Sequence, residues 1–99
     1  MKTETQFFVV KSHASPTVTI DPDVDALYIY FKRCKVHRTI PRPSKNMILN
    51  VDLDERGDVV GIEAIGAGQI EVGQLLKKAK VQAPRIDWSH MRIGQPAHA

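Results

Sequence analysis

The chain has 99 residues, of which 42% are hydrophobic and 25% charged, and these values fit one globular domain and exclude an intrinsically disordered chain. No apolar run approaches the roughly 18 residues of a membrane-spanning helix, and the acid that follows the N-terminal lysine is not typical of a signal peptide. The net charge of +3 excludes a strongly basic nucleic-acid binder. The single cysteine, Cys34, forms no internal disulfide, so we expect a reducing, cytoplasmic compartment.

The first half of the chain reads as strands separated by turns. Residues 5–11 are rich in aromatic and β-branched side chains, which predicts a strand. A short strand at 18–20 leads into a turn at 21–25, where aspartates and a proline favour tight backbone bends. Residues 26–32 alternate most clearly: Leu27, Ile29 and Phe31 share one predicted face, and the tyrosines share the other.

The middle of the chain predicts further strands. Residues 33–35 are a predicted turn, from which 36–40 return as a strand. Residues 41–46 contain two prolines, which donate no backbone hydrogen bond, so we expect a loop. The strands 47–54 and 58–65 then form a β-hairpin around a tight turn, in which Gly57 suits a positive φ.

The C-terminal part predicts one helix and a tail. Apolar residues recur at helical spacing over 70–81, and lysines gather near the end of that segment, where cations suit the helix dipole. Residues 84–99 lack periodicity and are a predicted loose tail, anchored by Ile86 and Trp88. We therefore expect one domain over residues 1–83 with an α+β fold: an antiparallel β-meander sheet of about four to six strands with a short C-terminal helix on one face.

Charge is segregated into two blocks of opposite sign. Residues 52–63 carry five acids and one arginine, whereas residues 32–45 carry no acid and six cations: Lys32, Arg33, Lys35, Arg38, Arg42 and Lys45. The basic stretch is a candidate contact for a protein partner or for a phosphate backbone, with Tyr28 and Tyr30 on the adjoining strand able to stack on bases. Opposite patches on one small molecule favour a protein partner or self-association.

The acidic turns suggest metal binding or hydrolysis as an alternative. Asp52, Asp54, Gly57 and Glu63 match positions one, three, six and twelve of a calcium loop, but Arg56 occupies position five, where its charge would repel the ion. The strand-like flanks favour a solvated hairpin turn instead. A second cluster of aspartates, in the turn at residues 21–25, is explained by turn formation.

The remaining polar residues predict no cofactor, metal or catalytic site. Cys34 and His37 stand three apart on an extended segment, which disfavours a shared metal. Ser89 and His90 are adjacent, but no nucleophile-elbow or oxyanion-hole motif accompanies them.

Two stretches together resemble a known family. The order D-x-x-x-D-A-L-Y-I at residues 21–29, followed by V-D-x-D-x-x-G-x-x-V-G-I-E at residues 51–63, is similar to the small bacterial proteins of domain-of-unknown-function family 2283. The resemblance implies a compact β-meander without an assigned activity, and an antitoxin-like or accessory role beside a small toxin-like protein. We therefore expect a non-enzymatic interaction module that forms a homodimer. Nucleic-acid binding is the first alternative.

Overall fold

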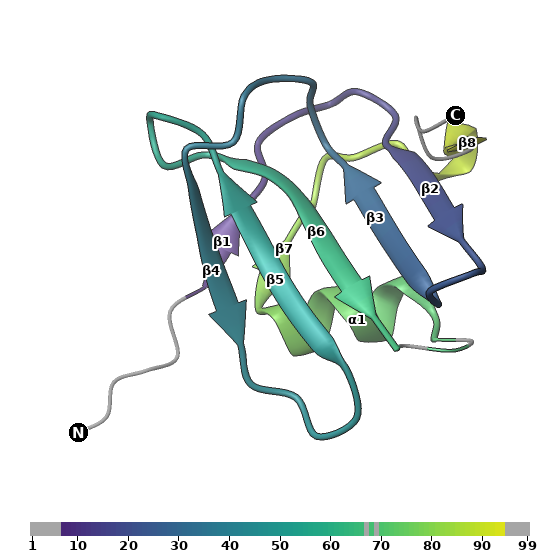
Figure 1. The fold of residues 1–99 in the computed structure, drawn as a ribbon. Coiled ribbons are helices and arrows are strands. Elements are labelled where there is room, and N and C mark those ends of the chain that lie inside the picture. Colours follow the sequence, from purple (N-terminus) through teal and green to yellow (C-terminus); the bar gives the residue numbers. More distant parts are fainter. Residues whose placement is uncertain (1–6, 67, 69, 95–99) are drawn as a thin grey trace.

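The computed structural model describes residues 7–66, 68 and 70–94 (Figure 1). Over these residues the chain forms eight strands, one α-helix and one 3-10 helix. In chain order they are β1 (Phe8–Val9), β2 (Thr17–Asp21), β3 (Ala26–Tyr30), β4 (Arg38–Arg42), β5 (Ile48–Leu53), β6 (Val59–Ile65), α1 (Val72–Ala79), β7 (Val81–Gln82), η1 (Trp88–His90) and β8 (Arg92–Gly94). No helix in this described part is long and apolar enough to cross a membrane.

Six of the strands form one sheet in the order β4-β5-β6-β3-β2-β8. All neighbours are antiparallel except β2 and β8, which run parallel. The pair β1 and β7 forms a separate parallel ladder and lies with α1 behind the sheet in Figure 1. The predicted α+β class, with a mostly antiparallel sheet and one helix packed on it, is confirmed.

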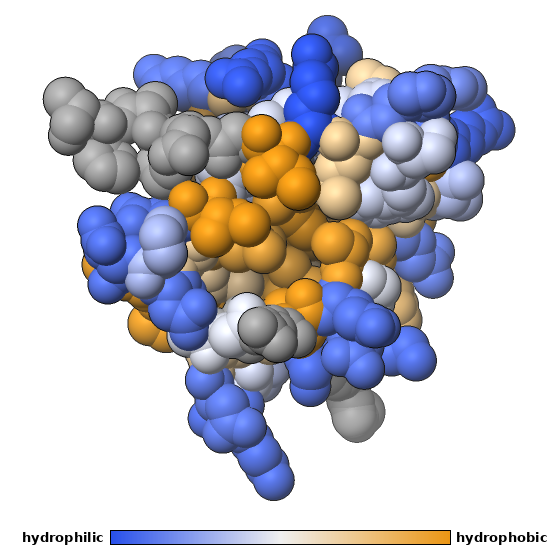
Figure 2. Space-filling view, turned by 90° about the vertical axis from the view of Figure 1, so that its right-hand side faces the viewer, coloured by the Kyte–Doolittle hydropathy of each residue, from blue (hydrophilic) through white to orange (hydrophobic). Residues whose placement is uncertain are grey.

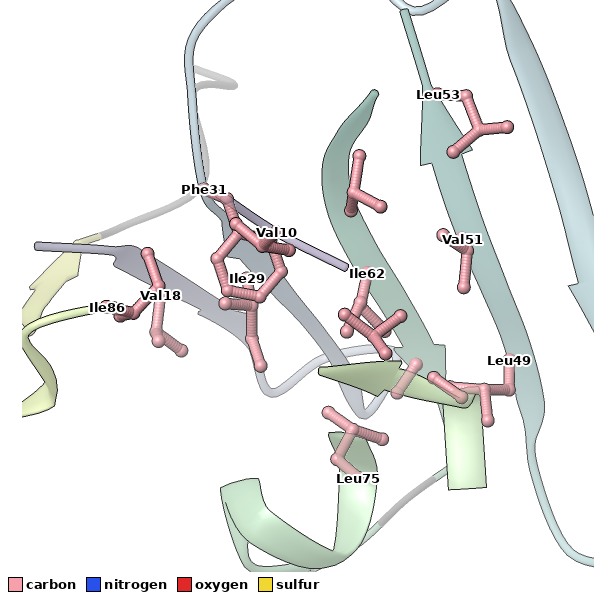
Figure 3. Close-up of a cluster of buried hydrophobic side chains, with 14 residues drawn as sticks. Val10, Val18, Ile29, Phe31, Leu49, Val51, Leu53, Ile62, Leu75 and Ile86 are labelled. Atoms are coloured by element: carbon pink, nitrogen blue, oxygen red, sulfur yellow. The ribbon is translucent and has the colours of Figure 1, made fainter. Parts of the chain in front are cut away.

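The core lies between the sheet and α1, and strand alternation builds it. Ile29 of β3, Val51 of β5 and Ile62 of β6 are fully buried, and Figure 3 shows them on the side of the sheet from which Leu75 of α1 approaches. Burial of such a side chain contributes about 1.5–3 kcal/mol. This single layer of aliphatic side chains determines which face of the sheet is covered by α1.

The helix α1 is shorter than the predicted segment 70–81. It ends because Lys80 adopts a left-handed conformation with a φ of 60°, and its N–H donates to the carbonyls of Leu76 and Lys77. The next residue, Val81, already belongs to β7. Leu75 and Ala79 are the residues that α1 buries, so the helix depends on the sheet for its stability.

The hairpin of β5 and β6 is confirmed. The N–H of Asp54 donates to the carbonyl of Asp58 at 2.8 Å, and Gly57 has a φ of 86°. An irregularity follows, since the register shifts between Asp52 and Leu53. A side chain on Gly57 would meet no atom, so only the backbone conformation requires glycine here.

The connection from β3 to β4 differs from the prediction. Residues 33–35 do not turn the chain back beside β3, whose neighbours are β2 and β6; they cross to the far edge, where β4 pairs with β5 alone. The sheet is thus a meander only over β4, β5 and β6. Pro41, expected in a loop, lies within β4, because an edge strand tolerates a residue without a backbone donor.

The two ends of the chain also differ from the prediction. The N-terminal strand is limited to Phe8–Val9, and residues 5 and 6 of its predicted extent lie outside the described part. The segment predicted as a tail instead forms the 3-10 helix η1 and then β8, which joins the sheet beside β2. Ile86 is buried and Trp88 packs edge-on against Phe31, as the predicted anchors require. Residues 95–99 lie outside the described part.

Candidate interaction surface

Arg42, one of the six cations of the basic stretch, is a packing residue. Its Nε donates to the carbonyl of Ala79 at the end of α1, at 2.9 Å, and its guanidinium lies 5.0 Å from the centre of the Phe8 ring. Burial lowers the pKa of Arg42. The side chain therefore ties the edge strand β4 to the helix side of the sheet, away from the other cations.

Lys32 is held by the acidic hairpin turn. Its Nζ lies 2.5 Å from a carboxylate oxygen of Asp54 and 3.8 Å from one of Asp58. The hydrogen bond to Asp54 raises the pKa of Lys32 and in turn lowers the pKa of Asp54. The two oppositely charged blocks of the sequence thus meet within one molecule at this point.

The other four cations are exposed but do not form one patch. Arg33 lies over the ring of Tyr30, 5.3 Å from its centre, and Lys35 follows in the β3–β4 connection. Arg38 begins β4, whereas Lys45 lies beyond the other end of that strand. The structure therefore separates these four cations, from the Tyr30 ring at the end of β3 to both ends of the edge strand β4.

No described element covers the face of the sheet opposite α1 (Figure 1). Its side chains are mostly polar, and the exposed Ile48 of β5 lies on the same side. We call this surface the open face and define it by six residues of β3 to β6: Tyr28, Tyr30, Thr39, Asn50, Asp52 and Glu63. These residues are half-buried apart from Thr39, which is exposed. Alternation places them on the side of each strand away from the core.

A hydrogen-bonded network orders the open face. The Tyr28 hydroxyl donates to Oδ2 of Asp52 at 2.6 Å, and the Thr39 hydroxyl donates to Oδ1 of the same carboxylate at 2.6 Å. Burial, and then the bond to Asp52, raises the pKa of Tyr28. Asn50 donates to Glu63 at 3.1 Å. The four strands β3, β4, β5 and β6 are thereby linked through their solvent-side polar groups.

Gly61 of β6 makes room for the aromatic part of the open face. A Cβ at this position would overlap the Tyr28 ring and the carbonyl oxygen of Ile29. The Tyr28 ring can therefore lie across β6, with the Tyr30 ring 4.3 Å from it between centres. This arrangement was not predicted from the sequence, although a glycine amid the valines and isoleucines of a strand signals a close approach.

Comparison with family models identifies the region that holds this surface. The model "Protein of unknown function (DUF2283)" matches residues 17–67, more than half of the chain. The chain belongs to the DUF2283 family. No curated protein and no solved structure matches the chain. The matched region runs from β2 to just past β6, so the whole open face lies inside the DUF2283 domain, whereas α1 and β8 lie outside it.

In the hairpin turn of the DUF2283 domain, an acidic side chain is hydrogen-bonded to backbone N–H groups of the same turn. Asp54 accepts hydrogen bonds from the N–H groups of Arg56 and Asp58, both at 2.9 Å. Asp52 and Glu63, the other acids of the calcium-loop match, instead bind side chains on the open face. Over the described residues, no group of three or more histidine, cysteine or acidic side chains is arranged to hold a metal ion.

The turn between β2 and β3 likewise uses its acids structurally. Asp21 accepts from the N–H of Asp23 at 3.2 Å. Asp25, with a φ of 52°, accepts from Gly66 through its carbonyl and from Gly68 through its carboxylate. These bonds join the turn to the end of β6.

Two further polar groupings lie beside or beyond the domain. Cys34 and His37 both line an open pocket of about 400 Å³ next to the hairpin turn, and Cys34 is exposed. Asp87 accepts hydrogen bonds from Ser89 and contacts Nδ1 of His90 at 2.6 Å. Ser89 and His90 are exposed, and Asp87 caps η1, so this grouping stabilises a turn.

Proposed function

We propose that this DUF2283 protein is a non-enzymatic interaction module that presents its open face to a protein partner. The observation that supports this is the asymmetry of the sheet, in which one face buries the core against α1 and the other exposes an ordered, tyrosine-rich surface. Tyrosine is enriched at protein interfaces because a rigid ring with a polar end gains contact area at a low entropic cost. The half-buried rings of Tyr28 and Tyr30 supply such an anchor.

The charges of the open face favour a protein over a nucleic acid. Asp52 and Glu63 flank the tyrosines, and a phosphate backbone would be repelled by both carboxylates. A partner with basic or hydrogen-bonding side chains complements the same groups. We propose a small, toxin-like protein as this partner, an antitoxin-like role for the chain, and a cytoplasmic setting.

Nucleic-acid binding is the second candidate. It is supported by the contact of Arg33 with the Tyr30 ring, and by the exposure of Lys35 and Arg38 farther along the chain. Such a site predicts affinity for mixed RNA or DNA that falls steeply with salt, and that weakens when Arg33→Ala is combined with Lys35→Ala.

The test uses the full chain, tagged and co-expressed with each small protein encoded by an adjacent gene. Tyr30→Ser removes an open-face ring, and Phe7→Ser is the matched control, since Phe7 is 52% exposed and lies outside the sheet. We expect co-purification of one small protein, with a dissociation constant raised about tenfold or more by Tyr30→Ser alone. If both variants bind the small protein equally well, the open face is not the surface that binds it. Salt-sensitive nucleic-acid binding without a protein partner would establish the second candidate.

A further inference from the structure

The two edges of the six-stranded sheet differ in how they are protected. The β4 edge carries Pro41 next to its central residue and arginines at both ends of the strand, and both features oppose strand pairing. The β8 edge carries Arg92, Ile93 and Gly94 and has no proline. Among the residues that the structure describes, β8 is therefore the edge strand that is open to another strand.

The backbone of β8 presents a donor and an acceptor at this edge. The N–H of Arg92 donates to the carbonyl of Pro16 at 3.0 Å, so Arg92 is the residue that bonds toward β2. Backbone groups of successive strand residues point to opposite sides. The N–H and C=O of Ile93 therefore point outward, as an edge strand offers them to another chain.

Exposed apolar side chains gather beside this edge. Ile93 is 69% exposed, Ile20 of β2 is 43% exposed, and Val24 in the next turn is 57% exposed. Ile93 is paired in register with Val18, whose side chain belongs to the core, so Ile93 lies on the α1 side of the sheet. Figure 2 shows a contiguous apolar patch on the side of the molecule where β2 and β8 lie.

The charges around the β8 edge favour pairing of two copies of the chain related by a twofold axis. Because β8 runs parallel to β2, Arg92 lies beside Thr17, at the end of β2 remote from the β2–β3 turn. That turn carries Asp21, Asp23 and Asp25, and residues 17–31 contain no lysine or arginine. If two β8 strands run antiparallel, the basic end of each is directed toward the acidic turn of the other.

We propose that β8 is a self-association edge, and that it pairs antiparallel with β8 of a second copy about a twofold axis at Ile93. The two Ile93 residues exchange their outward N–H and C=O groups, and the sheets join into one continuous sheet. The apolar patches beside β8 come together on the α1 side. This inference goes beyond the proposed function, because it uses a different surface from the open face.

The test measures self-association of the full chain by light scattering over a concentration series. Ile93→Asp places a charge at the axis on a side chain that is 69% exposed, and Ile48→Asp is the matched control because Ile48 is 57% exposed and belongs to β5. We expect a dimer whose dissociation constant rises about tenfold or more in Ile93→Asp and is unchanged in Ile48→Asp. A monomer at all concentrations would overturn the proposal.

A cross-link tests the geometry directly. In the proposed pair the two residues at position 93 have Cα atoms about 5.5 Å apart, within the roughly 4.4–6.8 Å that a disulfide spans. In a Cys34→Ser background, which removes the exposed native thiol, Ile93→Cys should give a covalent dimer under mild oxidation and Ile48→Cys should not. A dimer that forms without this cross-link, and that tolerates Ile93→Asp, would refute the β8 edge. Neither result depends on binding of a small protein to the open face, so the two proposals fail separately.

Discussion

Replacing Tyr28 with phenylalanine removes one hydroxyl group from the open face and leaves the ring in place. The lost interaction is the 2.6 Å hydrogen bond to Asp52. A hydrogen bond to a charged group contributes about 1.5–3 kcal/mol, but this carboxylate is only half-buried and keeps its bond to Thr39. We therefore expect a loss of about 1–1.5 kcal/mol in the free energy of unfolding, at or just below the lower limit of that range.

A loss of this size is measurable by thermal and urea denaturation. For a domain of this length, roughly 1 kcal/mol shifts the midpoint temperature by about 4–8 °C. Tyr30→Phe is the matched control, because over the described residues the Tyr30 hydroxyl makes no hydrogen bond, and it should leave the midpoint within about 2 °C of the wild type. If both variants unfold at the wild-type temperature, or lose equal stability, the network does not order the open face.

Three further predictions follow from individual contacts. Gly61→Ala should destabilise the fold by about 1–3 kcal/mol, because its Cβ overlaps the Tyr28 ring and a neighbouring backbone carbonyl; denaturation that matches the wild type would contradict the close approach. Lys32→Ala should raise the pKa of Asp54 toward its ordinary value, measured by NMR titration, since Lys32 is the first cause of its lowering. A carboxyl whose folded pKa is lowered stabilises the fold above its unfolded pKa and loses that effect as pH falls through the folded pKa, so the stabilities of wild type and variant should converge in acid; an unchanged Asp54 titration would contradict the ion pair. Arg42→Ala should cost about 1–2 kcal/mol through its lost bond to the helix end and its lost ring contact, whereas a change under about 0.5 kcal/mol would mean that it is an ordinary surface residue.

The elements with long apolar alternation could be predicted from the sequence, and those fixed by distant partners could not. Strands β3, β5 and β6 follow from a two-residue period that selects their buried face. The three-residue strand β8 has too few residues for a period, and its existence depends on β2, more than 70 positions earlier in the chain. The crossing from β3 to β4 was missed because alternation identifies faces and not neighbours.

The candidate interaction surface also contains features that alternation predicts and features that depend on which strands are neighbours. Alternation placed Tyr28 and Tyr30 together away from the core, but the bond to Asp52 needed β6 to lie between β3 and β5. Arg42 was grouped with the exposed cations because they are adjacent in sequence. A partial signal was present, since Arg38 and Arg42 are each two residues from the half-buried Ile40 and therefore share its face. Alternation did not show which of the two contacts the end of α1.

The most direct test of the proposed function is an amide NMR titration of the labelled chain with the small protein that co-purifies with it. The open-face account predicts that the largest shift changes fall on Tyr28, Tyr30, Asn50, Asp52 and Glu63. Changes confined to α1, or to the pocket beside Cys34, would contradict it.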